Sequence, residues 1–252
     1  MNWEAIAGEN IREGIRSHAL WATVAVFFIF VLVFGRFVSR ESLFTGEALM
    51  QTNARTFAFF LTFLFVPIVG LLVSYTALHH ARNRLAETEA SNDAVFFGTV
   101  AGRAGLLTLV LFVGFLPAFV VLLAQSGTAS LAEVIATFVG AVLFGLLFVA
   151  VGVAISAVAV TRLQAAFGAV GAFIALYAWP FIPGIVGLSV PHGLLERFWL
   201  IFVFGDTVGT LFALRQGTVS SSALGLLILG LAVVAILALS YVRFDRTVEA
   251  SA

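Results

Sequence analysis

Long apolar blocks separated by short polar segments dominate this chain. Most blocks exceed the ~20 residues that a helix needs to cross ~30 Å of hydrocarbon. The apolar residues run continuously within each block rather than along one face, which indicates helices surrounded by lipid. The pattern predicts an all-α membrane protein with six transmembrane helices, at Ala19–Phe34, Phe57–Leu78, Gly105–Ala124, Val134–Val160, Ala165–Leu188 and Ser222–Val242.

The arginines set the expected orientation. We favour a retained first helix over a cleaved signal, because its charged lead-in is long and no small-x-small site follows at Gly35–Ser39. With the N-terminus inside, eight arginines lie on the inner side and five on the outer side, which favours two cytoplasmic termini. The inner ones are Arg12, Arg16, Arg82, Arg84, Arg103, Arg162, Arg243 and Arg246, and the outer ones are Arg36, Arg40, Arg55, Arg197 and Arg215.

The first eighteen residues predict an amphipathic helix along the membrane surface. Apolar residues recur every four positions, and charged residues occupy the other faces. The apolar positions are Trp3, Ala7, Ile11 and Ile15, and the charged ones are Glu4, Glu9, Arg12, Glu13 and Arg16. This helix is either a plain interfacial anchor or a docking surface for a cytoplasmic partner.

Residues 189–221 are harder to interpret. Phe198–Phe204 is apolar but too short to span, and Thr207–Leu214 is a second short apolar run. We expect one or two re-entrant or interfacial helices on the outer side. A seventh span is the competing interpretation, and it would move the C-terminus outside.

A polar segment, residues 79–103, joins the second and third blocks. Asp93 is predicted as the N-cap of a helix beginning at Ala94. From spacing alone, an ordinary solvated loop is favoured over insertion into a groove on a peripheral protein. Its candidate functional side chains are His79, His80, Arg82, Arg84, Glu87, Glu89, Asp93 and Arg103.

Composition excludes several kinds of chemistry. Hydrophobic residues make up 62% of the 252 residues and charged residues 10%, against about 45–50% and about 25% in soluble domains. The chain has no cysteine, and all thirteen basic residues are arginine, so thiol chemistry and a P-loop lysine are absent. A net charge of zero argues against a nucleic-acid partner.

Catalytic and metal-binding patterns are also missing. Adjacent His79 and His80 would point about 100° apart on a helix, so they chelate poorly. Ser156 has no membrane-embedded base beside it, and the blocks contain almost no ionisable residues for ion coupling. A lipid-acting enzyme remains a minor alternative, with outer candidates Glu196, Arg197, Asp206 and Arg215.

Three stretches together resemble the ABC-2-type permeases, the transmembrane subunits of ATP-binding-cassette transporters. They are Asn10–Trp21, Asp93–Arg103 and Gly152–Ala157 with the following Thr161, Arg162 and Gly168. The branch most similar includes the permease of nitrous-oxide-reductase maturation. One departure is that many relatives carry a Glu-Arg-Glu-x-Gly-Thr type run where this chain has His80–Glu87, without the glycine and the first acidic residue.

The resemblance implies a single transmembrane domain over residues 1–252, with residues 1–18 as its elbow helix, including Trp3, Ile11, Arg12, Ile15 and Arg16. It implies that residues 79–103 form a cytoplasmic coupling loop that contacts an ABC ATP-binding subunit. A second permease copy and membrane lipid are the other implied partners. The chain itself would be no enzyme and hold no cofactor, since ATP is bound by the partner, and it would export a substrate across the plasma membrane. The alternative is a non-transporting membrane scaffold or assembly factor.

Overall fold

The computed structural model describes residues 2–26, 28–29, 65–87, 90–126, 131–178 and 223–249. Within these ranges the chain is helical and contains no strand. The labelled helices are α1 (Trp3–Ile15), α4 (Ala77–Glu87), α5 (Asn92–Ser126), α6 (Leu131–Val158), α7 (Arg162–Ala178) and α11 (Ala223–Glu249). Residues 18–26, 28–29 and 65–74 are also helical but carry no label.

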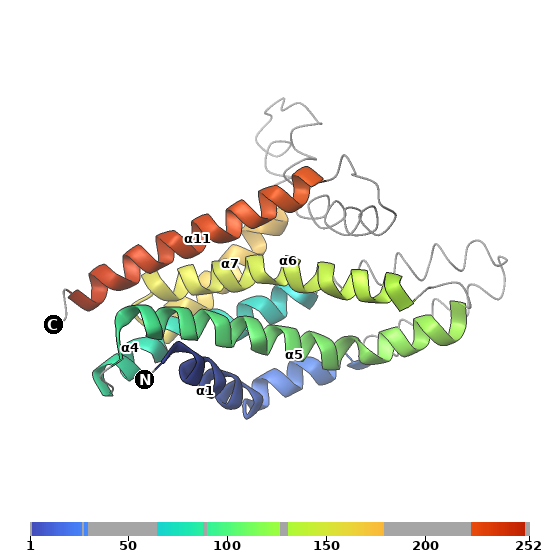
Figure 1. Ribbon diagram of the computed structural model, residues 1–252, viewed down its shortest axis with the longest axis horizontal. Helices are drawn as coiled ribbons and strands as arrows, with labels where there is room; N and C mark the ends of the chain where they lie inside the picture. The colour runs from blue at the N-terminus through green and yellow to red at the C-terminus, as the bar shows by residue number, and fades with distance from the viewer. Residues whose placement is uncertain are drawn as a thin grey trace.

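The long helices α5, α6 and α11 form a bundle whose axes run roughly side by side (Figure 1). One end of this bundle gathers α1, α4, the start of α5, the turn between α6 and α7, and the end of α11. The start of α1 and the end of α11 therefore lie at the same end of the molecule (Figure 1). This arrangement agrees with termini on one side of a membrane, while their cytoplasmic placement stays a prediction.

Two stretches of the described helices are long and apolar enough to cross a bilayer, judged by length and composition. They are Asn92–Gly114 in α5 and Phe138–Val158 in α6, and α7 contributes a shorter apolar stretch, Arg162–Leu176. The third and fourth predicted blocks overlap α5 and α6. The six-span layout stays a prediction, because much of the first, second and fifth blocks and all of residues 189–221 lie outside the described residues.

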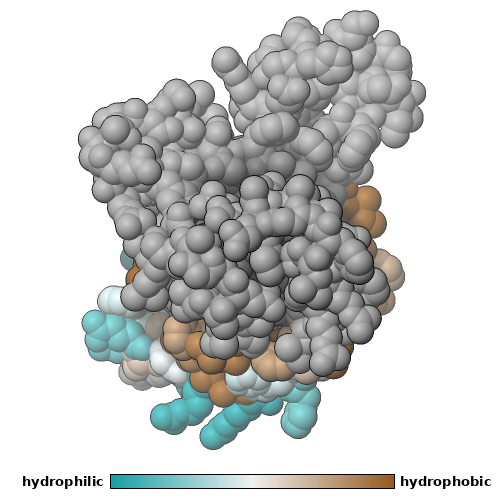
Figure 2. Space-filling view, turned by 90° about the vertical axis from the view of Figure 1, so that its right-hand side faces the viewer, coloured by the Kyte–Doolittle hydropathy of each residue, from teal (hydrophilic) through white to brown (hydrophobic). Residues whose placement is uncertain are grey.

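Large apolar side chains face outward along several helices at once. On α7 they follow helical spacing at Leu163, Phe167, Val170 and Ile174, and Phe167 is 70% exposed. A water-soluble monomer rarely exposes apolar surface on this scale. In Figure 2, hydrophilic atoms lie along the lower edge, where Figure 1 places α1, and hydrophobic atoms lie next to them. The outward faces therefore suit lipid or another apolar helix.

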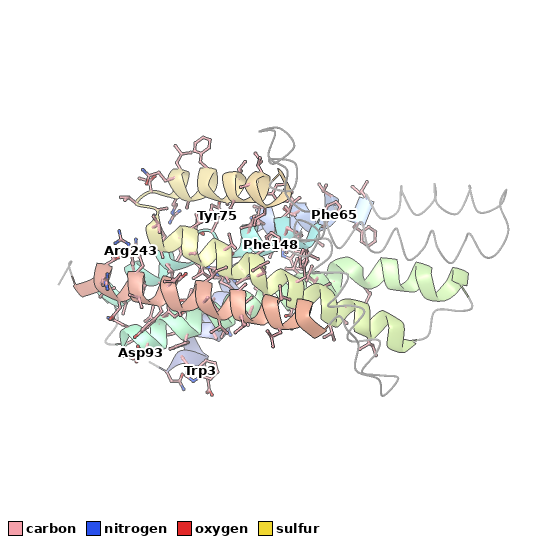
Figure 3. The ribbon with its side chains drawn as sticks, turned by 90° about the horizontal axis from the view of Figure 1, so that it is seen from above. Trp3, Phe65, Tyr75, Asp93, Phe148 and Arg243 are labelled. Atoms are coloured by element: carbon pink, nitrogen blue, oxygen red, sulfur yellow. The ribbon has the colours of Figure 1, made fainter. Side chains whose placement is uncertain are left out.

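The core is tightly packed where α6 crosses its neighbours. Phe144 and Phe148 are fully buried and meet edge to face at 5.2 Å, and Figure 3 shows Phe148 in the middle of the bundle. A Cβ on Gly70 would lie 2.8 Å from the Cβ of Phe148, so only glycine lets residues 65–74 approach α6 this closely.

Most of the polar segment 79–103 is helical, whereas the sequence favoured a loop that leads into a helix beginning at Ala94. α4 extends to Glu87 and α5 begins at Asn92, so few residues connect the two helices. The predicted cap is also wrong by two positions, because the amide of Ala94 donates to the hydroxyl oxygen of Ser91 at 3.3 Å. Asp93 instead lies in the first turn of α5, where its negative charge suits the helix dipole.

Helix α5 is longer than a span requires. Its 35 residues extend over about 52 Å at 1.5 Å per residue, against ~30 Å of hydrocarbon. The 27 residues of α11 extend over about 40 Å. Both helices are therefore longer than the membrane core is thick. The start of α5 and the end of α11 lie at the end of the bundle that also holds α4 and the start of α1 (Figure 1).

Candidate functional site at the polar end of the bundle

Ser156, near the end of α6, caps the start of α4. Its hydroxyl oxygen accepts the backbone amides of Leu78 at 2.9 Å and His79 at 3.3 Å. The first amides of a helix have no partner within it, and a serine usually supplies one from the residue just before the helix. Here the serine comes from another helix, and it is completely buried.

Two side chains of α4 in turn cap the end of α6. The guanidinium of Arg82 donates from Nη2 to the carbonyl oxygen of Ala157 at 2.8 Å. Nε2 of His79 lies 3.0 Å from the carbonyl oxygen of Val160, just after α6 ends. A carbonyl oxygen only accepts, so this nitrogen carries the proton. The two contacts occupy carbonyl groups that the end of a helix leaves open.

The cation of Arg82 also suits its position electrostatically. It lies at the negative end of the α6 dipole. Burial lowers the pKa of Arg82 from its usual value, and the nearby charge of Arg243 lowers it further. A guanidinium nevertheless stays charged at neutral pH.

The turn from α6 into α7 is fixed by a capping box. The hydroxyl of Thr161 accepts the amide of Gln164 at 3.2 Å. The side-chain oxygen of Gln164 accepts the amides of Val160 at 3.0 Å and Thr161 at 3.2 Å. This reciprocal arrangement satisfies several open amides at the start of α7.

A second polar contact joins the start of α5 to the end of α11. The hydroxyl of Tyr241 donates to Asp93 at 2.5 Å, and the side-chain amide of Asn92 donates to Asp245 at 2.9 Å. Figure 3 shows Asp93 and Arg243 at the same end of the bundle. The ring of Tyr241 also packs edge to face on Phe96 at 5.2 Å. The start of α5 is thus tied to α11 by polar and aromatic contacts.

Helix α1 packs against the N-terminal part of α5. Its buried positions are Ile6, Asn10 and Gly14. A Cβ on Gly98 would lie 2.6 Å from the carbonyl oxygen of Trp3, and one on Gly102 would lie 2.7 Å from the Cβ of Asn10. These glycines, four residues apart, let the two helices approach closely.

The buried face of α1 differs from the apolar positions in the sequence pattern. Trp3 and Ile15 are exposed, at 49% and 36%, while Ile11 is partly buried and packs on Gly105. Arg12 and Arg16 are exposed. Figure 3 shows Trp3 on the outer side of α1. The helix therefore has apolar side chains on its outer side and packs a different face against α5.

The predicted coupling residues occupy different environments. His79 and Arg82 contact α6, Asp93 contacts α11, and Arg103 is buried in α5 at 7% exposure. His80 is partly buried. Arg84 and Glu87 belong to α4, but their side chains are not among those that the structure describes. Glu89 lies outside the described residues.

Sequence reasoning missed Ser156, Gln164, Tyr241 and Asp245 as members of this polar end. The Thr161–Gln164 spacing of a capping box was the one signal available for Gln164. For the other three, nothing in the local sequence points to a partner more than seventy positions away.

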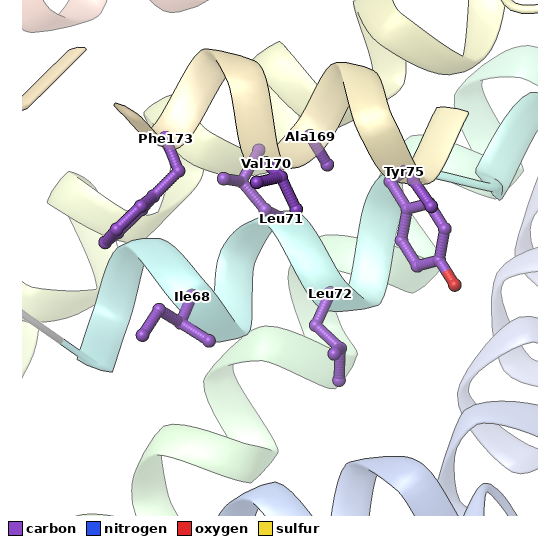
Figure 4. Close-up of a pocket in the computed structure, with 8 residues that line it drawn as sticks. Ile68, Leu71, Leu72, Tyr75, Ala169, Val170 and Phe173 are labelled. Carbon is purple, nitrogen blue, oxygen red and sulfur yellow. The ribbon is translucent and has the colours of Figure 1, made fainter. Parts of the chain in front are cut away.

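An apolar groove of about 380 Å³ lies between residues 65–74 and α7. Figure 4 shows Ile68 and Leu72 on one side and Phe173 on the other. The hydroxyl of Tyr75 is one polar group at its edge. Among the described residues, no group of three or more histidine, cysteine, aspartate or glutamate side chains could hold a metal ion.

The described part of the chain is thus a helical bundle with apolar outer faces and a polar end, as expected of a membrane protein. The family model for ABC-2 family transporter proteins matches residues 4–247. The chain therefore belongs to the ABC-2 transporter family, whose members are membrane components that work with an ATP-binding subunit. No curated protein matches it.

Proposed function

We propose that this chain is the permease subunit of an ABC transporter and that the polar end of its bundle receives an ATP-binding subunit. Family membership supports the first part. The second part rests on one observation. α4 is a polar helix, set among long apolar helices and lying at the end of the bundle that also holds the start of α1 and the end of α11 (Figure 1).

The finer features of the proposal follow the arginine distribution and the resemblance described above. They are six spans, cytoplasmic termini, the plasma membrane, a paired second permease copy and export, in the manner of the nitrous-oxide-reductase maturation branch. ATP-driven closure of the partner would move α4 and tilt the spans. Such coupling requires the permease conformations to bind the two states of the partner with different affinity.

The geometry narrows which residues are available to the partner. His79, Arg82 and Asp93 are engaged with other helices, and Arg103 is buried. We therefore propose that the partner docks on the later part of α4 and the residues after it, a segment in which the sequence has Arg84, Glu87 and Glu89. The partly buried Arg82 belongs to the contact between α4 and α6.

The test is a binding measurement with the permease in nanodiscs and its purified ATP-binding subunit. Arg84→Glu should weaken binding at least tenfold, because it reverses a charge in the segment proposed to dock. Arg162→Glu is the matched control, since Arg162 is an exposed arginine at the start of α7. Equal affinity of the Arg84→Glu and unaltered proteins would contradict the assignment of α4.

A further inference from the structure

The contacts between α4 and α6 form a reciprocal joint. Ser156 of α6 satisfies the first amides of α4, while His79 and Arg82 of α4 satisfy carbonyl groups at the end of α6. Each helix therefore supplies hydrogen-bond partners to backbone groups of the other helix that have no partner within that helix. A contact made on both helix ends resists sliding in either direction, because each shift leaves polar groups open.

Burial makes this joint stiff. Ser156 and Leu78 are fully buried, and Ala81 and Ala157 are nearly so. A Cβ on Gly152 would collide with Ser74, so the chain just before α4 is pressed directly onto α6. Buried polar groups that lose their partners are costly. Separating α4 from α6 therefore exposes amides and carbonyls together instead of one at a time.

The joint also reaches α7. His79 contacts the carbonyl oxygen of Val160, and the amide of the same residue is held by Gln164 in the capping box. Residue 160 is thus bound from both sides, once by α4 and once by the first turn of α7. Displacing α4 must displace this turn as well, unless these hydrogen bonds break.

We infer that Ser156, His79 and Arg82 are positioning residues that make α4, the end of α6 and the start of α7 move as one unit. This inference rests on the proposed function, in which a partner pushes α4. It goes beyond it by naming the path by which that push enters the bundle. The contacts are made to backbone groups, so the path needs no acidic partner for Arg82.

The first test measures amide hydrogen exchange in the purified permease alone. Ser156→Ala should speed exchange at Leu78 and His79 by roughly tenfold, the scale of losing a buried hydrogen bond. The matched control is Ser240→Ala. Ser240 is equally buried, but its hydroxyl donates to Ile236 in its own helix, so exchange in α4 should not change. If the amides of Leu78 and His79 exchange as slowly in Ser156→Ala as in the unaltered protein, the proposed joint is refuted.

The second test asks whether the joint transmits movement. The chain has no cysteine, so spin labels can be placed at Leu163→Cys and Val242→Cys, which are both exposed. In the complex, trapping with ATP and vanadate should shift the distance between these labels. Ser156→Ala should remove the shift, and Ser156→Thr, which keeps the hydroxyl, should restore it.

A full shift in Ser156→Ala would overturn the transmission path even if the complex forms normally. Arg162→Gln provides the control here, because this exposed arginine lies beside the same turn without joining α4 to α6. Failure of any ATP-binding subunit to associate with the unaltered permease would instead refute the proposed function. The exchange experiment would still decide whether the joint exists, so the two failures are distinguishable.

Discussion

The seating of α1 on α5 predicts that Gly102→Ala will loosen the N-terminal helix. A Cβ at this position would lie 2.7 Å from the Cβ of Asn10 and 2.9 Å from the carbonyl oxygen of Ala7. Favourable contacts between carbon atoms lie at about 3.5–4.0 Å. The oxygen belongs to the backbone and cannot rotate away. α1 must therefore shift outward by roughly 1 Å, which is the shortfall from that contact distance.

The expected loss is about 1–3 kcal/mol, the usual range for overpacking a filled site. Gly98→Ala should act similarly, since its Cβ would meet the carbonyl oxygen of Trp3 and the side chain of Ile6. The double variant should lose less than the sum. Once α1 has moved, the second methyl group meets open space, so the two changes share one displacement.

The assay combines an unfolding measurement with hydrogen exchange of α1 amides. Gly171→Ala is the control, because a Cβ there meets nothing within 4 Å. Both substitutions gain about 1 kcal/mol of helix propensity, so their difference isolates the clash. If Gly102→Ala is as stable as Gly171→Ala and α1 exchanges no faster, the close seating of α1 is refuted.

Further predictions concern the other contacts of the polar end. Gln164→Ala removes the capping box at the start of α7 and should lower the free energy of unfolding by about 0.5–2 kcal/mol, seen as faster exchange in the first turn of α7. Phe244→Ala empties a fully buried site and should cost about 3–5 kcal/mol in a denaturant titration. Tyr241→Phe should cost less, because it removes only the hydroxyl bond to Asp93 and keeps the ring on Phe96. A larger loss for Tyr241→Phe than for Phe244→Ala would contradict this order.

The helices at the centre of the chain were predictable from composition. The blocks at 105–124 and 134–160 fall on α5 and α6, because uninterrupted apolar sequence in lipid leaves few alternatives to helix. The predicted span began only at Gly105, although a helix beginning at Ala94 was predicted as well, and the structure shows one helix that starts at Asn92 and runs through both. Gly98, Gly102 and Arg103 resemble interfacial sequence, and only the neighbouring α1 shows why this stretch is helical and partly buried.

The sequence pointed to residues at the polar end of the bundle but not to the contacts between them, and the functional role of this end stays a prediction. The polar segment with His79 and Arg82 was singled out because it separates two long apolar blocks. Their contacts were beyond prediction, since both side chains bind backbone carbonyls about eighty positions away, one at the end of α6 and one in the turn after it. A carbonyl is present at every residue, so no side-chain pattern identifies which one is bound.

Nor could the role of Ser156 be found. A lone serine in an apolar helix usually bonds the carbonyl four residues earlier, as Ser74 and Ser240 do here. Ser156 instead accepts amides from another helix. The difference depends on which helix end lies opposite, and this is decided by packing through glycines such as Gly152.

The central claim is that this chain is a permease driven by a separate ATP-binding subunit. The most direct measurement is ATP hydrolysis by the complex purified from native membranes, with the subunits identified and their ratio determined. We expect the permease together with a P-loop subunit, with hydrolysis abolished by substituting the P-loop lysine of that partner and altered by Ser156→Ala in this chain. A permease that purifies without any ATP-binding subunit, or hydrolysis indifferent to its presence, would contradict the account.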